Sequence, residues 1–243
     1  MGITHKSNIK WHYVRDNTEA ARIVGQKISA DLTNWNNEPV LLLLSGGSSL
    51  RILDYIEIQN WTNITLFFLD ERFSVNNTDS NFAELTRTNW FTEISQANAN
   101  FIDSRVLPGE NQNSFSKRLT ENLNSWLKKN PTGKKIAIMG MGPDGHIGGI
   151  FPYPENPDLF AELFTGRELI VLHDVTGKNK FPHRVTTTYS FFHLIDKSYA
   201  YICGEEKRKA LSELQKNKLP HYQLPAKILY NLKDVFLVTD INI

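Results

Sequence analysis

Residues 40–49 read Val-Leu-Leu-Leu-Leu-Ser-Gly-Gly-Ser-Ser, five apolar residues that lead directly into a segment of serine and glycine. An unbroken apolar run of this length is typical of a strand buried on both faces of a parallel sheet. Residues 50–58 then read as a helix. Strand, short polar loop and helix in succession form the unit from which parallel α/β sheets are built.

The same alternation continues along most of the chain. Helical spacing is found at residues 17–32, where Asn17-Thr18 could cap the helix, and at 81–91, 114–127 and 205–215. Further strand-like runs occupy residues 64–69, 135–139, 168–172, 184–188, 199–203 and 235–239. This pattern predicts an α/β fold with a mostly parallel, Rossmann-like sheet and helices on both faces. Because no repeat or linker divides the chain, we expect a single domain over residues 1–243.

The composition of the chain excludes some classes of binding partner. The 27 Lys and Arg residues nearly balance 26 Asp and Glu, leaving a formal charge of +1, so we expect neither nucleic acid nor a membrane surface as partner. The longest apolar run, Val40 to Leu44, is too short to span a bilayer. One cysteine, Cys203, suits a reducing compartment. We therefore expect a cytoplasmic protein that binds a small molecule, as a monomer or a small homo-oligomer.

Three unusual segments each follow a predicted strand: residues 45–49, 70–72 and 140–146. In parallel sheets the ligand lies beyond the carboxyl ends of the strands, so these segments should converge on one site. The second reads Asp70-Glu71-Arg72, and its three charges should face a cleft or solvent because unpaired burial is costly. A surface cluster of ion pairs is the alternative interpretation of that tripeptide.

The segment Ser45-Gly46-Gly47-Ser48-Ser49 suits a phosphate group. Its glycines allow the backbone to approach a ligand, and the next helix presents free N–H groups. Taken alone, a tight turn with a serine cap explains it equally well. It is not a Walker loop, since no Gly-Lys-Ser/Thr follows, and Leu50 stands where a serine-hydrolase elbow needs glycine, which argues against a nucleophilic Ser48.

Residues 140–145, Gly-Met-Gly-Pro-Asp-Gly, formally match the dinucleotide fingerprint G-x-G-x-x-G. A helix should follow at once, but residues 146–154 contain two glycines and two prolines, so we reject that interpretation. We therefore interpret this segment as a glycine-rich loop that presents Asp144 and His146. A histidine can accept a proton from water near neutral pH, and a carboxylate can orient it; a histidine that only bonds loop backbone is the alternative.

Two basic residues downstream could hold a phosphate: Arg184 through its planar fork and Lys207 as a point charge. No H-x-H or H-E-x-x-H pair occurs among the seven histidines, so no catalytic zinc is expected, and no other cofactor is indicated.

Together these segments resemble the 6-phosphogluconolactonase family, within the wider group that includes glucosamine-6-phosphate deaminases. The similarity covers residues 45–226 in family order. The matching segments are Ser45–Ser49 (family S-G-G-S-T), Asp70–Arg72 (D-E-R), Asp79–Phe82 (S-N-Y), Gly140–His146 with Phe151-Pro152 (G-M-G-x-D-G-H-x-x-S-L-F-P), Pro182–Thr188 (P-x-R-I-T-L-T), Gly204–Leu211 (G-x-x-K-x-x-A-L) and Leu224–Ala226 (L-P-A).

The resemblance implies one domain of the sugar-phosphate isomerase/lactonase type. It also implies hydrolysis of 6-phospho-D-glucono-1,5-lactone to 6-phosphogluconate in the oxidative branch of the pentose phosphate pathway, without metal or cofactor. His146 would be the general base, supported by Asp144, and Arg72 would contact substrate phosphate or ring. The expected substrate and phosphate ligands are Gly46, Gly47, Ser48, Ser49, Asp70, Arg184 and Lys207.

One departure lies beside the proposed base. Ile147-Gly148-Gly149-Ile150 replaces a T-A-S-L type run, and we expect its glycines to loosen the loop. The nearest rival activity is amino-sugar phosphate deamination, whose catalytic glutamate aligns with Phe151, a residue that cannot exchange a proton. A sugar-phosphate sensor would bind without turnover; no DNA-binding segment precedes residue 40, which disfavours it.

Overall fold

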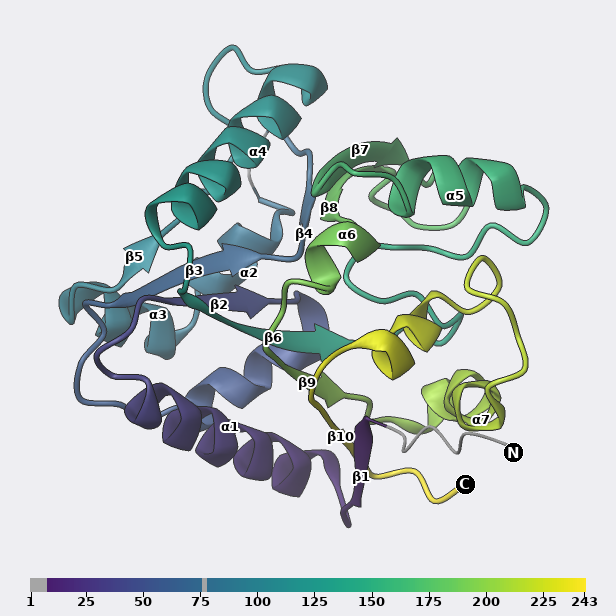
Figure 1. The fold of residues 1–243 in the computed structure, drawn as a ribbon, viewed down its shortest axis with the longest axis horizontal. Helices are drawn as coiled ribbons and strands as arrows, with labels where there is room; N and C mark the ends of the chain where they lie inside the picture. Colours follow the sequence, from purple (N-terminus) through teal and green to yellow (C-terminus); the bar gives the residue numbers. More distant parts are fainter. Residues whose placement is uncertain (1–7, 76–77) are drawn as a thin grey trace.

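The computed structural model describes residues 8–75 and 78–243. Its main sheet has seven strands, and every pairing between them is parallel (Figure 1). Their order is β1 (Ile9–Tyr13), β10 (Val235–Thr239), β9 (Lys197–Tyr201), β6 (Lys134–Gly140), β2 (Val40–Leu44), β3 (Ile64–Phe68) and β5 (Asn100–Phe101). The predicted α/β fold with a mostly parallel sheet is confirmed.

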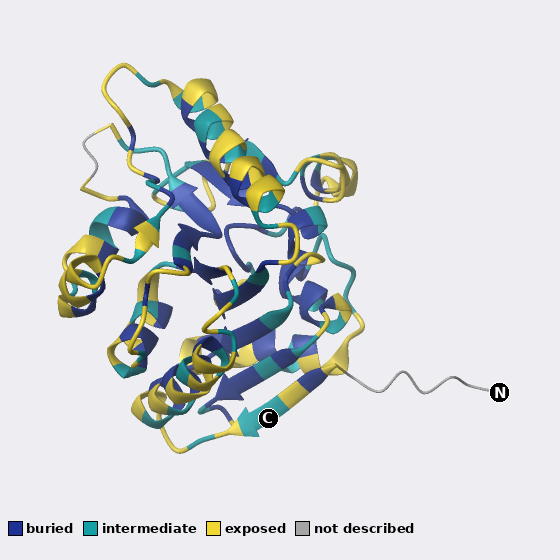
Figure 2. Cartoon of the chain, turned by 60° about the vertical axis from the view of Figure 1, so that its left-hand side comes forward, coloured by how far each residue is buried: buried dark blue, intermediate teal, exposed yellow. Residues whose placement is uncertain are grey.

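Both faces of this sheet are buried, which explains the unbroken apolar runs. In β2, Leu42 packs in a cluster with residues of α1 (Asn17–Asn34) and of η1, a 3-10 helix at Gly47–Tyr55. Leu41 packs on the opposite face with residues of α4 (Gln112–Lys129). Figure 1 shows α1 and α4 on the two sides of the sheet, and in Figure 2 the strands between the helices are mostly buried.

A second, small sheet was not expected. It consists of β4 (Asp70–Arg72), β8 (His183–Thr187) and β7 (Ile170–Asp174), paired antiparallel in that order. The runs at 168–172 and 184–188 are strands as predicted, but they belong to this sheet and not to the parallel one. The charged tripeptide 70–72, expected as the end of β3, is a strand of its own.

Leu69 joins the two sheets. Its N–H donates to the carbonyl oxygen of Leu44 in β2 over 2.9 Å, and its carbonyl oxygen accepts from the Thr187 N–H of β8 over 2.8 Å. The chain therefore leaves the main sheet and enters the small one within a single residue. This change of direction places β4 at the carboxyl end of β3, above the edge where a ligand was expected.

Some helix boundaries differ from the sequence prediction. Asp16, and not Asn17-Thr18, caps α1: its Oδ1 accepts from Thr18 N at 2.9 Å and Glu19 N at 2.8 Å. The helix expected at 50–58 is the 3-10 helix η1, which begins earlier and ends at Tyr55. The segment 81–91 is divided because the Thr88 side chain accepts from Phe91 N and starts a second helix.

The remaining elements are α2 (Asn81–Thr86), α3 (Asn89–Gln96), α5 (Pro157–Phe164), α6 (Tyr189–Phe192), η2 (Glu205–Lys207), α7 (Arg208–Lys216) and η3 (Pro225–Asn231). Of these, α2 and α3 pack in the cluster on the α1 side of the sheet, and α5, α6, α7 and η3 pack in the cluster on the α4 side. Of all the elements, β1, β5, α5, α6 and η3 were not predicted. Among the helices that the structure describes, none is both long and apolar enough to cross a membrane.

Candidate active site

A cleft of about 460 Å³ lies between the carboxyl edge of the main sheet and the small sheet. It brings together the three segments that the sequence placed at one edge. Main-sheet loops contribute Ser45, Gly46, Gly47, Ser48, Gly140, Gly142, His146 and Lys207, and the small sheet contributes Asp70, Arg72 and Arg184. Two of the expected residues do not line the cleft: Ser49 is buried beneath the loop, and Asp144 is exposed and contacts His146.

His146 is held from one side by Asp144. The Nδ1 atom of the ring is 2.6 Å from Asp144 Oδ1, and the same oxygen accepts the His146 backbone N–H at 3.1 Å. Burial alone raises the pKa of the Asp144 carboxyl group, but the hydrogen bonds from His146 outweigh it and hold that pKa below its usual range. With Nδ1–H donating to a carboxylate, the other ring nitrogen is free to accept a proton.

Phe151 holds the other side of the ring. Its own ring is stacked on His146, with centroids 4.4 Å apart and planes inclined by 23°, and its side chain is fully buried. Gly142 completes this support, because a Cβ at that position would lie 2.1 Å from His146 Cε1. The imidazole is therefore fixed by a carboxylate, an aromatic face and a bare glycine.

The Gly148-Gly149 pair does not loosen the loop as expected. Ile147 and Ile150, both fully buried, exchange backbone hydrogen bonds of 3.2 and 2.9 Å across the pair. Gly148 and Gly149 have φ values of +52° and +78°, as required at both central positions of a tight type I′ turn. A Cβ on Gly149 would also lie 2.2 Å from Asp70 Oδ1. These glycines make the loop tight and allow the small sheet to approach it.

Asp70 and Arg184 form a buried ion pair at the floor of the small-sheet side. Arg184 Nε donates to Asp70 Oδ1 at 3.0 Å, and Arg184 Nη2 contacts Oδ2, so the contact is bidentate. Burial lowers the pKa of Arg184 to about 10, which still leaves it cationic at neutral pH. Arg184 thus reaches the cleft with part of its fork already bound to a carboxylate.

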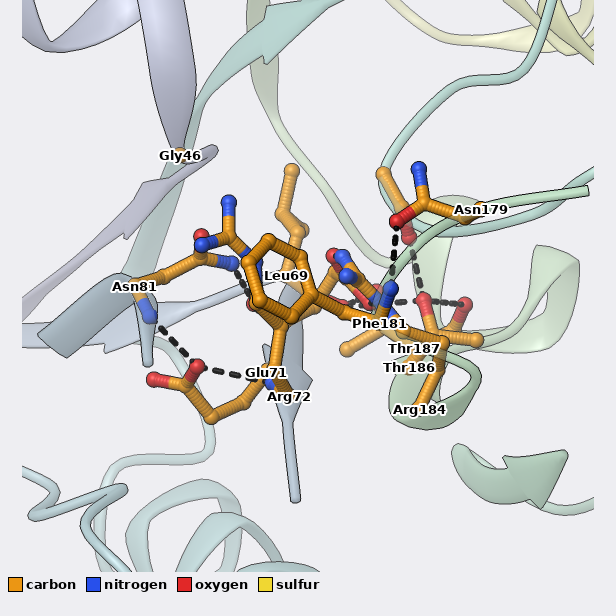
Figure 3. Close-up of polar contacts among 12 residues, drawn as sticks. Gly46, Leu69, Glu71, Arg72, Asn81, Asn179, Phe181, Arg184, Thr186 and Thr187 are labelled. Carbon is orange, nitrogen blue, oxygen red and sulfur yellow. Dashed lines mark hydrogen bonds and ion pairs between the residues drawn. The ribbon is translucent and has the colours of Figure 1, made fainter. Parts of the chain in front are cut away.

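Glu71 faces neither the cleft nor solvent, contrary to the prediction. It is 1% exposed, and its carboxylate accepts hydrogen bonds from the backbone N–H groups of Arg72, Asn81 and Phe82 and from the Ser104 hydroxyl, at 2.6–2.9 Å. Figure 3 shows the contacts with Arg72 and Asn81. Burial raises its pKa to about 7 against the opposing effect of these donors. Hydrogen-bond donors from three segments of the chain stabilise the buried carboxylate of Glu71. The tripeptide sequence alone does not indicate these donors.

Arg72 lines the cleft, and part of its guanidinium group is already bound to other residues. Its Nη1 donates to the Asp79 carbonyl oxygen at 2.8 Å and to Glu84 Oε1 at 2.7 Å, and its guanidinium lies 4.4 Å from the centre of the Phe181 ring. Within the described residues, its buried Nε–H has no hydrogen-bond partner.

Ser48 and Ser49, the last two residues of the glycine-rich segment 45–49, differ in their exposure to the cleft. Ser48 lines the cleft, and its Oγ is 3.4 Å from Lys207 Nζ. Lys207 is buried, which lowers the pKa of its amine. Ser49, expected as a phosphate ligand, is 1% exposed and donates its hydroxyl to the Ser45 carbonyl oxygen at 3.0 Å. The loop thus offers Ser48 to a ligand beside Lys207 of η2, while the Ser49 hydroxyl stabilises the loop from within.

Asn81 is a cleft residue that was not among the expected ligands, although the S-N motif contains it. Its Nδ2 donates to the Asp70 carbonyl oxygen at 2.7 Å, and a Cβ on Gly46 would lie 2.1 Å from its Oδ1. Asn179, Lys180 and Phe181 also line the cleft, and no sequence signal pointed to them. Figure 3 shows Asn179 and Phe181.

No group of three or more His, Cys, Asp or Glu side chains within residues 8–75 and 78–243 is arranged to hold a metal ion. The chemistry that this site offers is that of a fixed imidazole, hydroxyl and backbone donors, and several cations. This set suits an anionic substrate that reacts with water.

Comparisons with known proteins identify the family of this chain. Relatives named 6-phosphogluconolactonase include one from Aggregatibacter actinomycetemcomitans, 27% identical over 218 residues (84% of this chain, 87% of the relative), and one from Haemophilus influenzae, 29% identical over 202 residues (78% and 79%).

Solved structures with a similar fold include the 6-phosphogluconolactonases of Thermotoga maritima (22% identity, TM-score 0.73, 95% of this chain and 99% of that one) and Plasmodium vivax (19%, 0.77, 97% and 92%). A monomeric glucosamine-6-phosphate deaminase is similar as well (16%, 0.66, 95% and 96%). The model of the glucosamine-6-phosphate isomerase/6-phosphogluconolactonase family matches residues 15–237, and the chain belongs to this family.

Proposed function

We propose that this chain is a cytoplasmic 6-phosphogluconolactonase, which hydrolyses 6-phospho-D-glucono-1,5-lactone to 6-phosphogluconate. The observation that carries the proposal is the support of His146: Asp144 on one side, and Phe151 stacked on the other at 4.4 Å. In the deaminases a catalytic glutamate aligns with Phe151. Here that position holds a hydrocarbon ring, which orients the base but cannot carry a proton.

His146 acts as the general base. Its Nδ1–H is bonded to Asp144, so Nε2 takes a proton from a water molecule as the water oxygen attacks C1 of the lactone. The C1 carbonyl oxygen becomes an oxyanion, and its collapse breaks the bond between C1 and the ring oxygen. The imidazolium returns the proton to that oxygen, which leaves as a hydroxyl, and the new carboxylic acid ionises to a carboxylate.

The phosphate is held at the loop after β2. Ser48 and Lys207 lie 3.4 Å apart there, Gly46 lines the cleft beside Asn81, and Gly47 leaves the backbone open to an anion. Arg184 contributes the part of its fork that Asp70 does not occupy. Anchoring the phosphate places the lactone carbonyl at the other end of the substrate beside His146, so that the reaction with water gains from orientation.

The test supplies freshly made lactone from the oxidation of glucose 6-phosphate and follows its loss against the spontaneous rate. We expect clear acceleration by the wild type, and a loss of about 10²- to 10⁴-fold in kcat for His146→Ala, the range of general-base contributions. His193→Ala is the control, since this exposed histidine lies outside the cleft. An unimpaired His146→Ala enzyme would refute the mechanism, and ammonia release from glucosamine 6-phosphate at enzymatic rates would favour the deaminase alternative.

A further inference from the structure

The connection between β7 and β8 forms one side of the cleft. Asn179, Lys180 and Phe181 line it from this connection. The connection is closed at its base by a hydrogen bond of 2.8 Å from Val175 N to the Pro182 carbonyl oxygen. Within it, Asn179 Oδ1 accepts the Phe181 N–H at 3.0 Å, so the segment has a defined turn and not an open loop.

Phe181 lies between two cations. The Arg72 guanidinium is 4.4 Å from the centre of its ring, and Lys180 Nζ is also 4.4 Å from that centre. Both distances fall within the range of cation–π attraction. The ring therefore brings a cation of β4 and a cation of the connection into the same part of the cleft.

Among the cations on this side of the cleft, Lys180 differs from Arg72 and Arg184 in its ion pairing. Arg184 is paired with Asp70, and Arg72 is paired with Glu84 at 2.7 Å. No ion pair of Lys180 is found among the residues that the structure describes. A cation that lines a cleft without a carboxylate partner is available to an anionic ligand.

The connection lies next to the loop that bears the proposed base. Lys178 Nζ donates to the Pro152 carbonyl oxygen at 2.7 Å, directly after Phe151, whose ring stacks on His146. The Asp144 carboxylate acts on Lys178 as well: burial lowers the pKa of this lysine, and Asp144 partly opposes the shift. The cations of the connection are thus placed near the reacting end of the substrate.

We propose that Lys180, supported by the ring of Phe181, recognises the negative charge that hydrolysis creates at C1. This inference rests on the proposed function. The lactone has one anionic group, its phosphate, for which Ser48 and Lys207 provide a site. When water attacks, the π electrons of the carbonyl move to its oxygen, and after ring opening and loss of a proton the product keeps this charge as a carboxylate. A second, unpaired cation near His146 suits a molecule that gains a second anion during the reaction.

The experiment compares two ligands that share the phosphate and differ at C1. Calorimetry of the wild type should give a lower Kd for 6-phosphogluconate, which has the carboxylate, than for glucose 6-phosphate, which lacks it. Lys180→Met should reduce this preference about tenfold, equivalent to about 1.4 kcal/mol. Lys180→Arg should restore much of it, and the affinity for inorganic phosphate should stay the same in all three proteins.

Lys129→Met is the matched control, because it removes one exposed lysine at the end of α4, on the opposite edge of the sheet. With the lactone as substrate, Lys180→Met should lower kcat and leave KM nearly unchanged, since the charge forms only as the reaction proceeds. Phe181→Leu, which keeps an apolar side chain but removes the ring, should weaken the same preference.

Three results would overturn the inference: no preference in the wild type, an unchanged preference in Lys180→Met, or an equal loss for both ligands. A failure of the proposed function has a different signature. In that case the lactone is not hydrolysed, whereas the preference for the carboxylate ligand and its dependence on Lys180 can still be measured.

Discussion

The main-sheet wall of the cleft and the small-sheet wall hold their functional groups in different ways. On the main-sheet wall, His146 and Lys207 stand on loops that follow parallel strands, among glycines, and Lys207 has no ion pair within the described residues. On the small-sheet wall, Asp70 and Arg184 neutralise each other in a buried pair. The difference indicates that one wall keeps its groups free for a ligand, while charges on the other wall also hold the structure together.

The largest expected effect tests the paired wall. Arg184→Met leaves Asp70 buried without its cation, and removing one partner of a buried pair costs about 3–5 kcal/mol. Chemical denaturation should show this loss in the free energy of unfolding, together with a raised KM. The double variant Asp70→Asn/Arg184→Met should recover much of the stability but not the KM. A stable single variant would show that the pair is not structural.

A smaller effect concerns His173 in β7, which belongs to the same small sheet. Burial lowers its pKa to about 4, below the value of 6.5 for an exposed histidine. The unfolded chain therefore binds the proton first, so stability present above pH 6.5 is lost as the pH falls toward 4. Over this pH range the free energy of unfolding should fall by about 3 kcal/mol less in His173→Phe than in the wild type. Parallel pH profiles of the two proteins would contradict the assignment.

The third prediction sharpens the view of the main-sheet wall. A Cβ in Gly142→Ala would lie 2.1 Å from His146 Cε1, so the ring must move. A displacement near 1 Å can cost about 100-fold in rate, and we expect such a loss in kcat with little change in melting temperature. Gly140→Ala is the control, because its Cβ would meet nothing nearer than 3.9 Å. Equal kinetics of the two variants would show that the ring is not held by this contact.

The smallest effect on stability is expected for Lys207→Met. Burial lowers the pKa of this lysine, and no carboxylate lies within ion-pair distance in the described part of the chain. Losing the charge should leave the free energy of unfolding unchanged or raise it by about 1 kcal/mol. KM should rise about tenfold or more, since a hydrogen bond to a charged group contributes about 1.5–3 kcal/mol. A destabilised Lys207→Met protein with a normal KM would show that Lys207 stabilises the fold and does not bind the ligand, contrary to the difference between the two walls.

The main-sheet wall could be predicted because it depends on local order along the chain. A buried strand ends and a glycine-rich loop begins at Ser45 and again at Gly140, and parallel strands bring such loops to one edge. The small-sheet wall could not be predicted in this way. Its pairing joins Asp70 to Thr186 across more than a hundred residues, and three-residue β4 carries no strand pattern.

The same distinction explains the individual residues. Glu71 was expected to face the cleft or solvent, and its burial could not be predicted because its donors come from three segments that only the fold brings together. Ser49 was expected at the phosphate, but the 3-10 turn directs its hydroxyl back to Ser45. Phe181 and Lys180 had no signal, since their role depends on the position of Arg72 in another strand.

The tight turn at Gly148 and Gly149 has a consequence for the history of this chain. A side chain at Gly149 would collide with Asp70 and would require a backbone that only glycine adopts easily. A single substitution at either glycine is therefore expected to strain the turn, and at Gly149 it would also disturb the contact with Asp70. In an alignment of closely related sequences, positions 148 and 149 should therefore both keep glycine or change together.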